Sequence, residues 1–209
     1  MSNLTLRGNA GGAGTFILES PNSANSRTLT LPDATTTLVG TDATQTLTNK
    51  TLQGGAITQG TAVPSTSGTV IDFTGIPSWV KRITIGFRGV STSGSNGFLL
   101  LVGTSSGLVS SGYTGSAFRY NTGTTSNSTT HFPLSEGVNA ASVMDGHVVL
   151  VNHSANIWTL GGVLLTLSTG VTSVAGAITL SGVLDRLRVS TIGGTDTFDA
   201  GSINIMWEG

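Results

Sequence analysis

The sequence predicts an all-β protein: a short extended β segment at the amino terminus, followed by an antiparallel β-sandwich of jelly-roll-like type, assembled as an oligomer. Two observations predict the sandwich. Apolar and polar residues alternate on both sides of a Pro-Ser-Trp corner between Val70 and Val90, as expected of strands with one buried face. Apolar runs then recur at intervals of about 10 residues, with no amphipathic helical pattern between them.

The first part of the chain, residues 1–60, contains short β-like phrases but little material for a core. Clusters of Gly, Pro, Asn and Asp, which favour turns, separate phrases at residues 3–7, 15–19, 27–31 and 36–39. The only aromatic residue here is Phe16, and the whole chain lacks cysteine. Because so small a segment seldom folds without disulfides, metal or partners, we expect it to oligomerise or to dock on another protein. Residues 41–60 are its Thr-rich connector.

Residues 61–209 are predicted to form the sandwich, a head domain with its own core. Two alternating segments on either side of Pro77 predict strands joined by a rigid bend, because Pro77 fixes its own φ and disfavours helix at Ile76. Continuous apolar runs predict strands covered on both faces at residues 98–102, 147–151, 157–160 and 163–167. We also expect a hairpin loop at 152–156, a final strand over 203–208, and burial of Trp79, Trp158 and Trp207 in the core.

Residues 103–130 are mostly Ser, Thr, Gly and Asn, and are predicted to form a surface loop region. Tyrosine among such residues is typical of adaptable binding loops, which a rigid scaffold commonly carries. The candidate binding residues are Tyr113, Phe118, Arg119, Tyr120 and His131. The alternative for the aromatic residues is packing beneath the loop, since tyrosine is often partly buried.

Composition excludes several classes of function. Only 9% of residues are charged and the formal net charge is −1, so the chain cannot assemble the basic surface that nucleic-acid binding requires. The amino terminus lacks a secretory-signal pattern, and no apolar run approaches the length of a membrane span. Lysine, which commonly protects sheet edges, occurs only at Lys50 and Lys81. We therefore expect neighbouring copies of the chain to cover the exposed edges of the predicted sheets.

One catalytic pattern occurs, a Gly-x-Ser-x-Gly match at residues 103–107 with Asp145 and His147 downstream. A nucleophile elbow needs a helix after its serine, and the residues that follow Ser105 are poor helix formers. His147 and His153 would lie about 20 Å apart on one strand, too far to share a metal ion. A single histidine repeated around a threefold axis could bind metal, and His131 is such a candidate, but we expect it to be a hydrogen-bonded loop histidine instead. We predict no enzymatic activity, no cofactor and no metal.

Two stretches resemble proteins of bacteriophage particles. SRTLTLPDATTTLVGTDATQTLTNKTL, residues 26–52, is similar to a recurrent segment of tail-fibre and related virion proteins. IDFTGIPSWVKRITIGFRGVSTSGS, residues 71–95, together with LDRLRVSTIGGTDTFDAGSINIMWEG, residues 184–209, resembles a carboxy-terminal domain of phage fibres and prophage tail proteins. The second pair is the more specific, because its apolar frame and its FDAGSINI ending occur in register.

The resemblance implies a homotrimer on the virion, made in the cytoplasm of a bacterial host. Residues 1–60 would attach to other virion proteins, and residues 61–209 would bind a host-surface glycan, as in a short tail fibre or fibre tip. Aromatic rings stack on sugars and arginine donates paired hydrogen bonds, which suits the candidate residues. The chain has no long shaft, so a capsid decoration or cement protein is the alternative. A fibre-borne esterase or depolymerase is the remote one.

Overall fold

The computed structural model describes residues 11, 12, 22, 24–26, 28, 57–140 and 142–209. The chain divides into two units, Met1–Lys50 and Thr51–Gly209. The strands predicted between residues 3 and 39, and the attachment role of residues 1–60, fall almost wholly outside the described residues. The described part of the chain contains strands and no helix, and therefore no helix long and apolar enough to cross a membrane.

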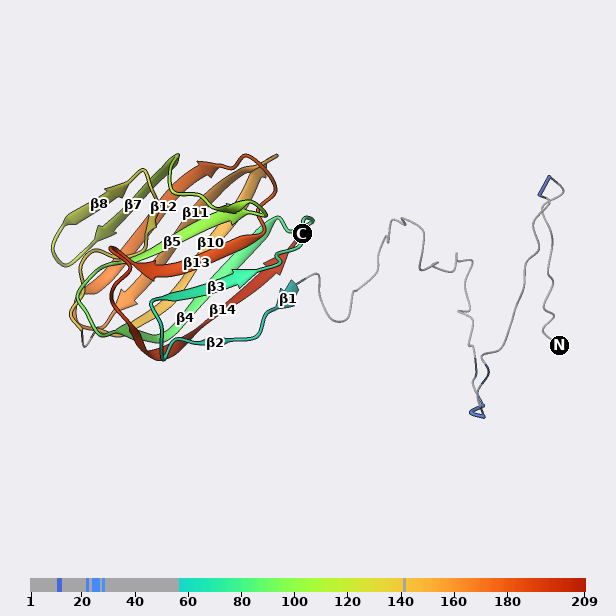
Figure 1. Cartoon of the computed structure of the whole chain (residues 1–209), viewed down its shortest axis with the longest axis horizontal. Coiled ribbons are helices and arrows are strands. Elements are labelled where there is room, and N and C mark those ends of the chain that lie inside the picture. The colour runs from blue at the N-terminus through green and yellow to red at the C-terminus, as the bar shows by residue number, and fades with distance from the viewer. Residues whose placement is uncertain (1–10, 13–21, 23, 27, 29–56, 141) are drawn as a thin grey trace. The chain divides into compact units, whose positions relative to one another are not determined.

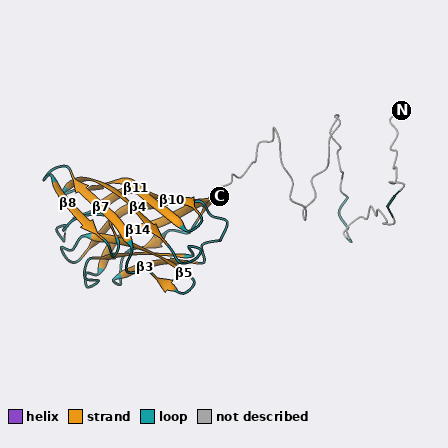
Figure 2. Ribbon diagram, turned by 90° about the horizontal axis from the view of Figure 1, so that it is seen from above, coloured by secondary structure: helices purple, strands orange, loops and turns teal. Residues whose placement is uncertain are grey.

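Residues 57–209 form a sandwich of two antiparallel sheets, which confirms the predicted all-β class and the antiparallel β-sandwich (Figures 1 and 2). The nine-stranded sheet has the order β1-β14-β4-β10-β11-β12-β7-β8, with β2 also paired to β14. Its strands are β1 Ile57–Gln59, β2 Val63–Pro64, β4 Arg82–Thr92, β7 Tyr113–Arg119, β8 Thr124–Ser128, β10 Met144–Ser154, β11 Ile157–Thr166, β12 Gly170–Thr179 and β14 Phe198–Glu208. The five-stranded sheet has the order β3-β13-β5-β6, with β9 paired to β5. Its strands are β3 Val70–Thr74, β5 Phe98–Thr104, β6 Gly107–Leu108, β9 Phe132–Pro133 and β13 Arg186–Thr191.

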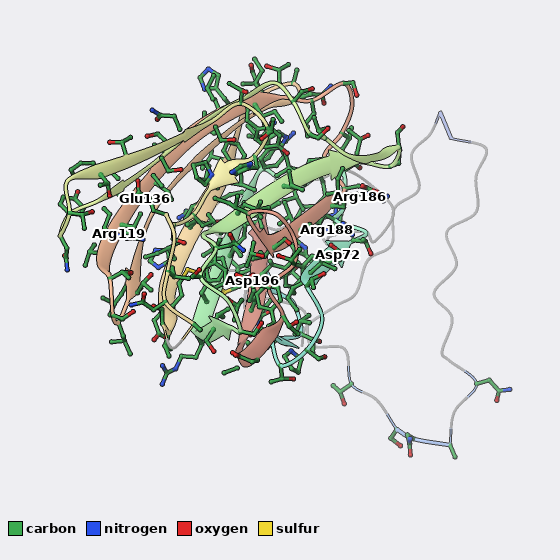
Figure 3. The ribbon with its side chains drawn as sticks, turned by 60° about the vertical axis from the view of Figure 1, so that its left-hand side comes forward. Asp72, Arg119, Glu136, Arg186, Arg188 and Asp196 are labelled. Carbon is green, nitrogen blue, oxygen red and sulfur yellow. The ribbon has the colours of Figure 1, made fainter. Side chains whose placement is uncertain are left out.

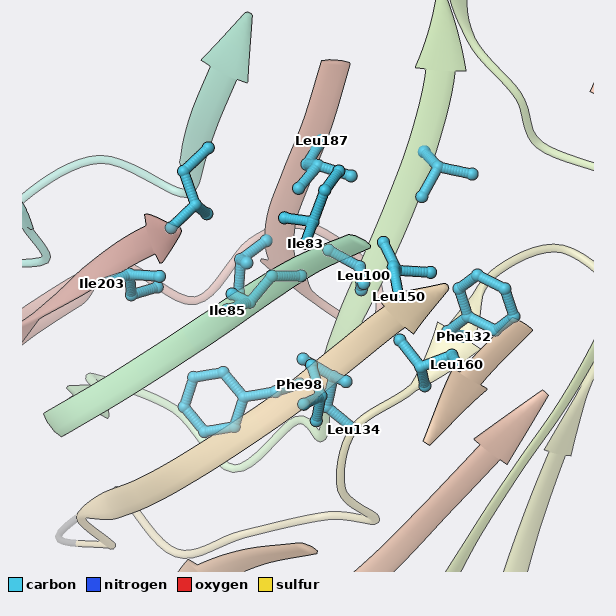
Figure 4. Packing of buried hydrophobic residues seen from close by; sticks show 14 of the residues in the cluster. Ile83, Ile85, Phe98, Leu100, Phe132, Leu134, Leu150, Leu160, Leu187 and Ile203 are labelled. Carbon is cyan, nitrogen blue, oxygen red and sulfur yellow. The ribbon is translucent and has the colours of Figure 1, made fainter. Parts of the chain in front are cut away.

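The core lies between the two sheets and is built by alternation along the strands (Figure 4). On β4, the inward side chains are buried while their neighbours face outward. The small sheet contributes the opposing layer, so each sheet hides one face against the other. The residues of this core that Figure 4 labels are Ile83, Ile85, Phe98, Leu100, Phe132, Leu134, Leu150, Leu160, Leu187 and Ile203.

The predicted corner joins the two sheets, because β3 belongs to the small sheet and β4 to the large one. The expectation that Trp79 is buried was wrong: its side chain is 51% exposed. Ile76 and Val80, on either side of the bend, fill the core at this end in its place. Trp158 is buried as expected, and Trp207 is partly buried against the core.

The expectation that the apolar runs are covered on both faces holds for only one of them. Residues 98–102 are largely buried. Residues 147–151, 157–160 and 163–167 alternate instead, with Val151, Val163 and Leu165 exposed on the outer face of the large sheet. The small sheet covers only the inner face, and within the described residues no further layer packs on the outer one.

The stretch predicted as a loop, residues 103–130, is mostly strand. It completes β5 and forms β6, β7 and β8. The Ser- and Gly-rich sequence of β7 has a low strand propensity. Hydrogen bonds to β12 along the whole length of β7 stabilise the strand instead. By contrast the hairpin at 152–156 was predicted correctly; it joins β10 to β11 with Ala155 at a positive φ of 44°.

Adjacent bulges bend the large sheet where β4 passes between β10 and β14. Gly89 and Gly201 face each other there with positive φ values of 64° and 88°. The Asp145 carboxylate of β10 accepts hydrogen bonds from the Gly89 N–H at 2.9 Å and from Arg88 at 3.0 Å. The Arg88 hydrogen bond first, and then that from Gly89, hold the pKa of Asp145 below its ordinary value of 3.8.

We expect the Asp145→Asn variant to lower the free energy of unfolding at neutral pH. Because the folded pKa of Asp145 is depressed, its stabilisation is fully present above the unfolded pKa of about 3.8 and is lost as pH falls through the folded value. The difference between wild type and variant should therefore shrink in acid. Urea denaturation over a pH series measures it, and a difference that stays constant into acid would contradict the assignment.

Candidate functional site

The outer face of the nine-stranded sheet carries the candidate site. One row of side chains crosses it, because residues paired across neighbouring strands share a face. The row runs from Gly86 on β4 through His147, Val163 and Ser173 to Phe118 on β7. At about 4.8 Å per strand, its two ends are roughly 19 Å apart.

An aromatic pair, Phe118 and Tyr120, stands at the β7 end of this row. The two ring centroids are 5.3 Å apart and the rings are nearly perpendicular, at 81°. The Tyr120 hydroxyl shares a 2.9 Å hydrogen bond with Ser173 on β12, and its backbone N–H donates to the Val171 carbonyl. Tyr120 remains 59% exposed. The pair is therefore fixed in orientation and open to solvent.

An apolar end lies beside the aromatic pair on the same outer face. It consists of Leu165 and Leu167 near the end of β11, together with Val171 on β12. Leu167 is the most exposed of them, at 66%. Contiguous exposed apolar side chains of this kind mark surfaces that contact another molecule.

The structure removes Tyr113 from the predicted contact surface. Its side chain is 1% exposed and packs edge-on against Phe132, with ring centroids 4.8 Å apart. Its hydroxyl accepts a hydrogen bond from the Val102 N–H and donates to the Val109 carbonyl, both at 2.9 Å. Burial raises the pKa of Tyr113 to about 12 despite the hydrogen bond with Val102. Tyr113 is thus a core residue that joins β7 to the β5–β6 hairpin.

Arg119 also lies inside, on the same inward face of β7 as Tyr113. Its guanidinium donates to the Gly137 carbonyl at 2.7 Å. Figure 3 shows Arg119 in a different part of the domain from Asp72 and Arg188. A side chain buried in this way does not meet a surface ligand, so its predicted contact role is corrected.

His131 is only partly buried and is held by its neighbours. Its Nδ1 lies 3.1 Å from the Ser128 hydroxyl and 3.0 Å from that of Thr130. Burial lowers its pKa from the ordinary value of 6.5. Of the predicted contact residues, only Phe118 and Tyr120 come together on an open face.

A hollow of about 430 Å³, absent from the sequence-based predictions, opens at the other end of the row. It lies over Gly86, between His147 on β10 and Asn204 on β14, which are the cross-strand neighbours of that glycine. Its lining residues are Gln59, Thr84, Gly86, His147, Asn204 and Met206. The sequence signal was a glycine in the middle of an alternating strand, which often marks close approach of a ligand.

The catalytic pattern at Gly103–Gly107 is a hairpin turn. Ser105 and Ser106 form the turn between β5 and β6, and strand β6 follows where an elbow requires a helix. Asp145 and His147 lie on β10 of the other sheet. In the described part of the chain, no three His, Asp or Glu side chains lie close enough together to hold a metal ion.

Comparison with known proteins gives no match: no protein-family model, no curated protein and no solved structure is significantly similar to this chain.

We expect Tyr113→Phe and Tyr120→Phe to differ in stability, because the same hydroxyl is removed from two environments. Tyr113→Phe leaves the buried Val102 N–H and Val109 carbonyl without that partner, at a cost of about 1–3 kcal/mol. Tyr120→Phe removes an exposed hydrogen bond and should stay within about 0.5 kcal/mol of wild type. Urea denaturation measures both, and equal losses would contradict the burial assigned to Tyr113.

Proposed function

We propose that this chain is a structural protein of a bacteriophage particle, a short tail fibre or fibre tip, whose sandwich domain binds a host-surface glycan. The observation that carries the proposal is the aromatic pair of Phe118 and Tyr120, fixed and open on the outer face of the large sheet. Sugars have apolar C–H faces that pack on aromatic rings. The role is binding without covalent chemistry, on a homotrimer attached to the virion through residues 1–60.

The sequence resemblance supports the same proposal from a different direction. Its two more specific stretches, residues 71–95 and 184–209, lie far apart in the chain but form paired strands. Strand β13 pairs with β3, and β14 pairs with β4 along most of its length. The resemblance therefore falls on one connected part of the sandwich, which spans both sheets.

The apolar end of Leu165, Leu167 and Val171 favours a second candidate, a capsid decoration or cement protein. Exposed apolar surface is typical of contacts with other proteins, either shell subunits or neighbouring copies. In that function the outer face binds protein, and loss of the chain weakens the particle without affecting adsorption.

We expect the Phe118→Ala, Tyr120→Ala double variant to lower glycan binding about tenfold or more, because two stacking contacts of about 1 kcal/mol each are lost. The measurement is retention on an array of uncharged and acidic oligosaccharides from bacterial surface polysaccharides, followed by competition with phage adsorption. The domain should remain folded, since both side chains are exposed.

Trp79→Ala is the matched control, because Trp79 is also an exposed aromatic residue but lies at the corner between β3 and β4. It should leave retention unchanged. Loss of retention with Trp79→Ala alone would move the site to the corner. Failure of the wild-type chain to bind any member of the array would overturn glycan recognition.

The Leu165→Ser, Leu167→Ser double variant separates the two candidate functions. A receptor-binding fibre should keep its glycan retention, whereas a decoration protein should lose affinity for the particle and lower the particle's resistance to heat. Native mass spectrometry of the same samples reports the oligomer, which we expect to be a trimer of 21.1 kDa chains. A monomeric wild-type chain would contradict the proposed assembly.

A further inference from the structure

We propose that the hollow over Gly86 binds one uncharged sugar unit of the glycan that the aromatic pair recognises. This inference rests on the proposed function, and it adds a second contact site with its own residues. The hollow is lined by side chains of β1, β4, β10 and β14, so it is built by the centre and one edge of the large sheet.

The hollow exists because residue 86 is a glycine, which has no side chain to fill it. Gly86 faces outward between Thr84 and Arg88, the neighbouring outward positions of β4, which both carry side chains. Its φ lies outside the left-handed region, and a Cβ added there would come no closer to its surroundings than 3.9 Å, to the Asn204 carbonyl. Neither backbone conformation nor close packing requires glycine, so the fold itself leaves this space open.

The lining suits a polyhydroxylated ligand. The Asn204 Oδ1 accepts a hydrogen bond from the Ile205 N–H at 2.8 Å, which fixes the amide and leaves its NH₂ group as a donor. Gln59, Thr84 and His147 add further donors and acceptors around the rim. Met206 and the Gly86 backbone supply a less polar surface for the C–H face of a sugar. A few polar groups beside apolar surface are typical of small-molecule sites.

Charge at the hollow favours an uncharged unit. None of the residues that line it is Lys, Arg, Asp or Glu. The charged side chains in the neighbouring rows pair with each other: Arg82 with Glu208 at 3.2 Å, and Arg88 with Asp145 at 3.0 Å. An acidic sugar would find no unpaired Lys or Arg among these residues, so its charge would not increase its affinity for the hollow.

The hollow and the aromatic pair lie on the same row of the sheet. Gly86 and Phe118 are four strands apart, which is roughly 19 Å. Val163 and Ser173 lie between them on the outer face. An extended oligosaccharide that crosses the strands can therefore contact both sites at once, and linked contacts strengthen each other.

The test fills the hollow without unfolding the domain. Gly86→Val places a β-branched side chain in open space, so stability should be retained or increased. The probes are methyl glycosides of common uncharged bacterial sugars, namely glucose, galactose, mannose, rhamnose and N-acetylglucosamine, together with the best oligosaccharide from the array. Nuclear magnetic resonance of the Asn204 and Gln59 side-chain amides and the His147 ring reports binding at the hollow.

We expect at least one methyl glycoside to shift these signals in wild type and not in Gly86→Val, and the variant to bind the oligosaccharide about tenfold more weakly. Gly161→Val is the matched control, because Gly161 also faces outward in open space but does not line the hollow. It should retain the shifts.

Failure of this inference can be told apart from failure of the proposed function. If no methyl glycoside shifts the signals of the side chains that line the hollow, or if Gly86→Val binds the oligosaccharide as wild type does, the hollow is not a sugar site. The role of the aromatic pair is then still tested by the Phe118→Ala, Tyr120→Ala variant. If the signals at the hollow shift while the Phe118 and Tyr120 double variant binds the oligosaccharide normally, the hollow remains a sugar site and the aromatic pair is not one. Loss of the shifts in Gly161→Val would overturn their assignment to the hollow.

Discussion

The alternation of side chains along β4 is the constraint on which both the core and the outer face depend. Ile83 and Ile85 point into the sandwich, while Thr84 and Gly86 point out. A slip of one residue in register would exchange the two sets and expose the core. The register is set on both sides, since β4 pairs with β10 and β14. The Asp145 carboxylate further fixes the bulge at the end of this segment.

Sequence periodicity could predict this strand because only one of its faces is apolar. It failed at β7, which the Ser- and Gly-rich composition predicted as a loop and where Tyr113 and Ala117 on one face compete with Phe118 on the other. With an aromatic residue on each face, the period of two is present but its inward side is undetermined. The pairing with β12 decides it, and that contact is distant in sequence. The hollow was missed for the same reason, because its neighbouring side chains come from four strands.

Four arginines of the sandwich are each paired with a nearby carboxylate, and this limits the anions that its surface can attract. On the outer face of the small sheet, Arg188 binds both carboxylate oxygens of Asp72 at 2.6 Å (Figure 3). Every arginine that the structure describes is engaged by a carboxylate or a carbonyl: Arg82, Arg88, Arg119, Arg186 and Arg188. With few unpaired cations, the proposed glycan recognition would depend on shape, stacking and neutral hydrogen bonds, which suit an uncharged glycan.

The glycines of the large sheet are of two kinds: those that the backbone geometry requires, and those that it does not. Gly201 has a positive φ, and a Cβ at Gly162 would lie 2.7 Å from the His147 carbonyl, so backbone geometry accounts for both. Gly86 and Gly161 have neither constraint, although glycine within a strand costs roughly 0.5–1 kcal/mol relative to alanine. Both face outward on the same side of the sheet. The physical effect of glycine at these positions is therefore on the shape of the outer face, where a ligand would lie.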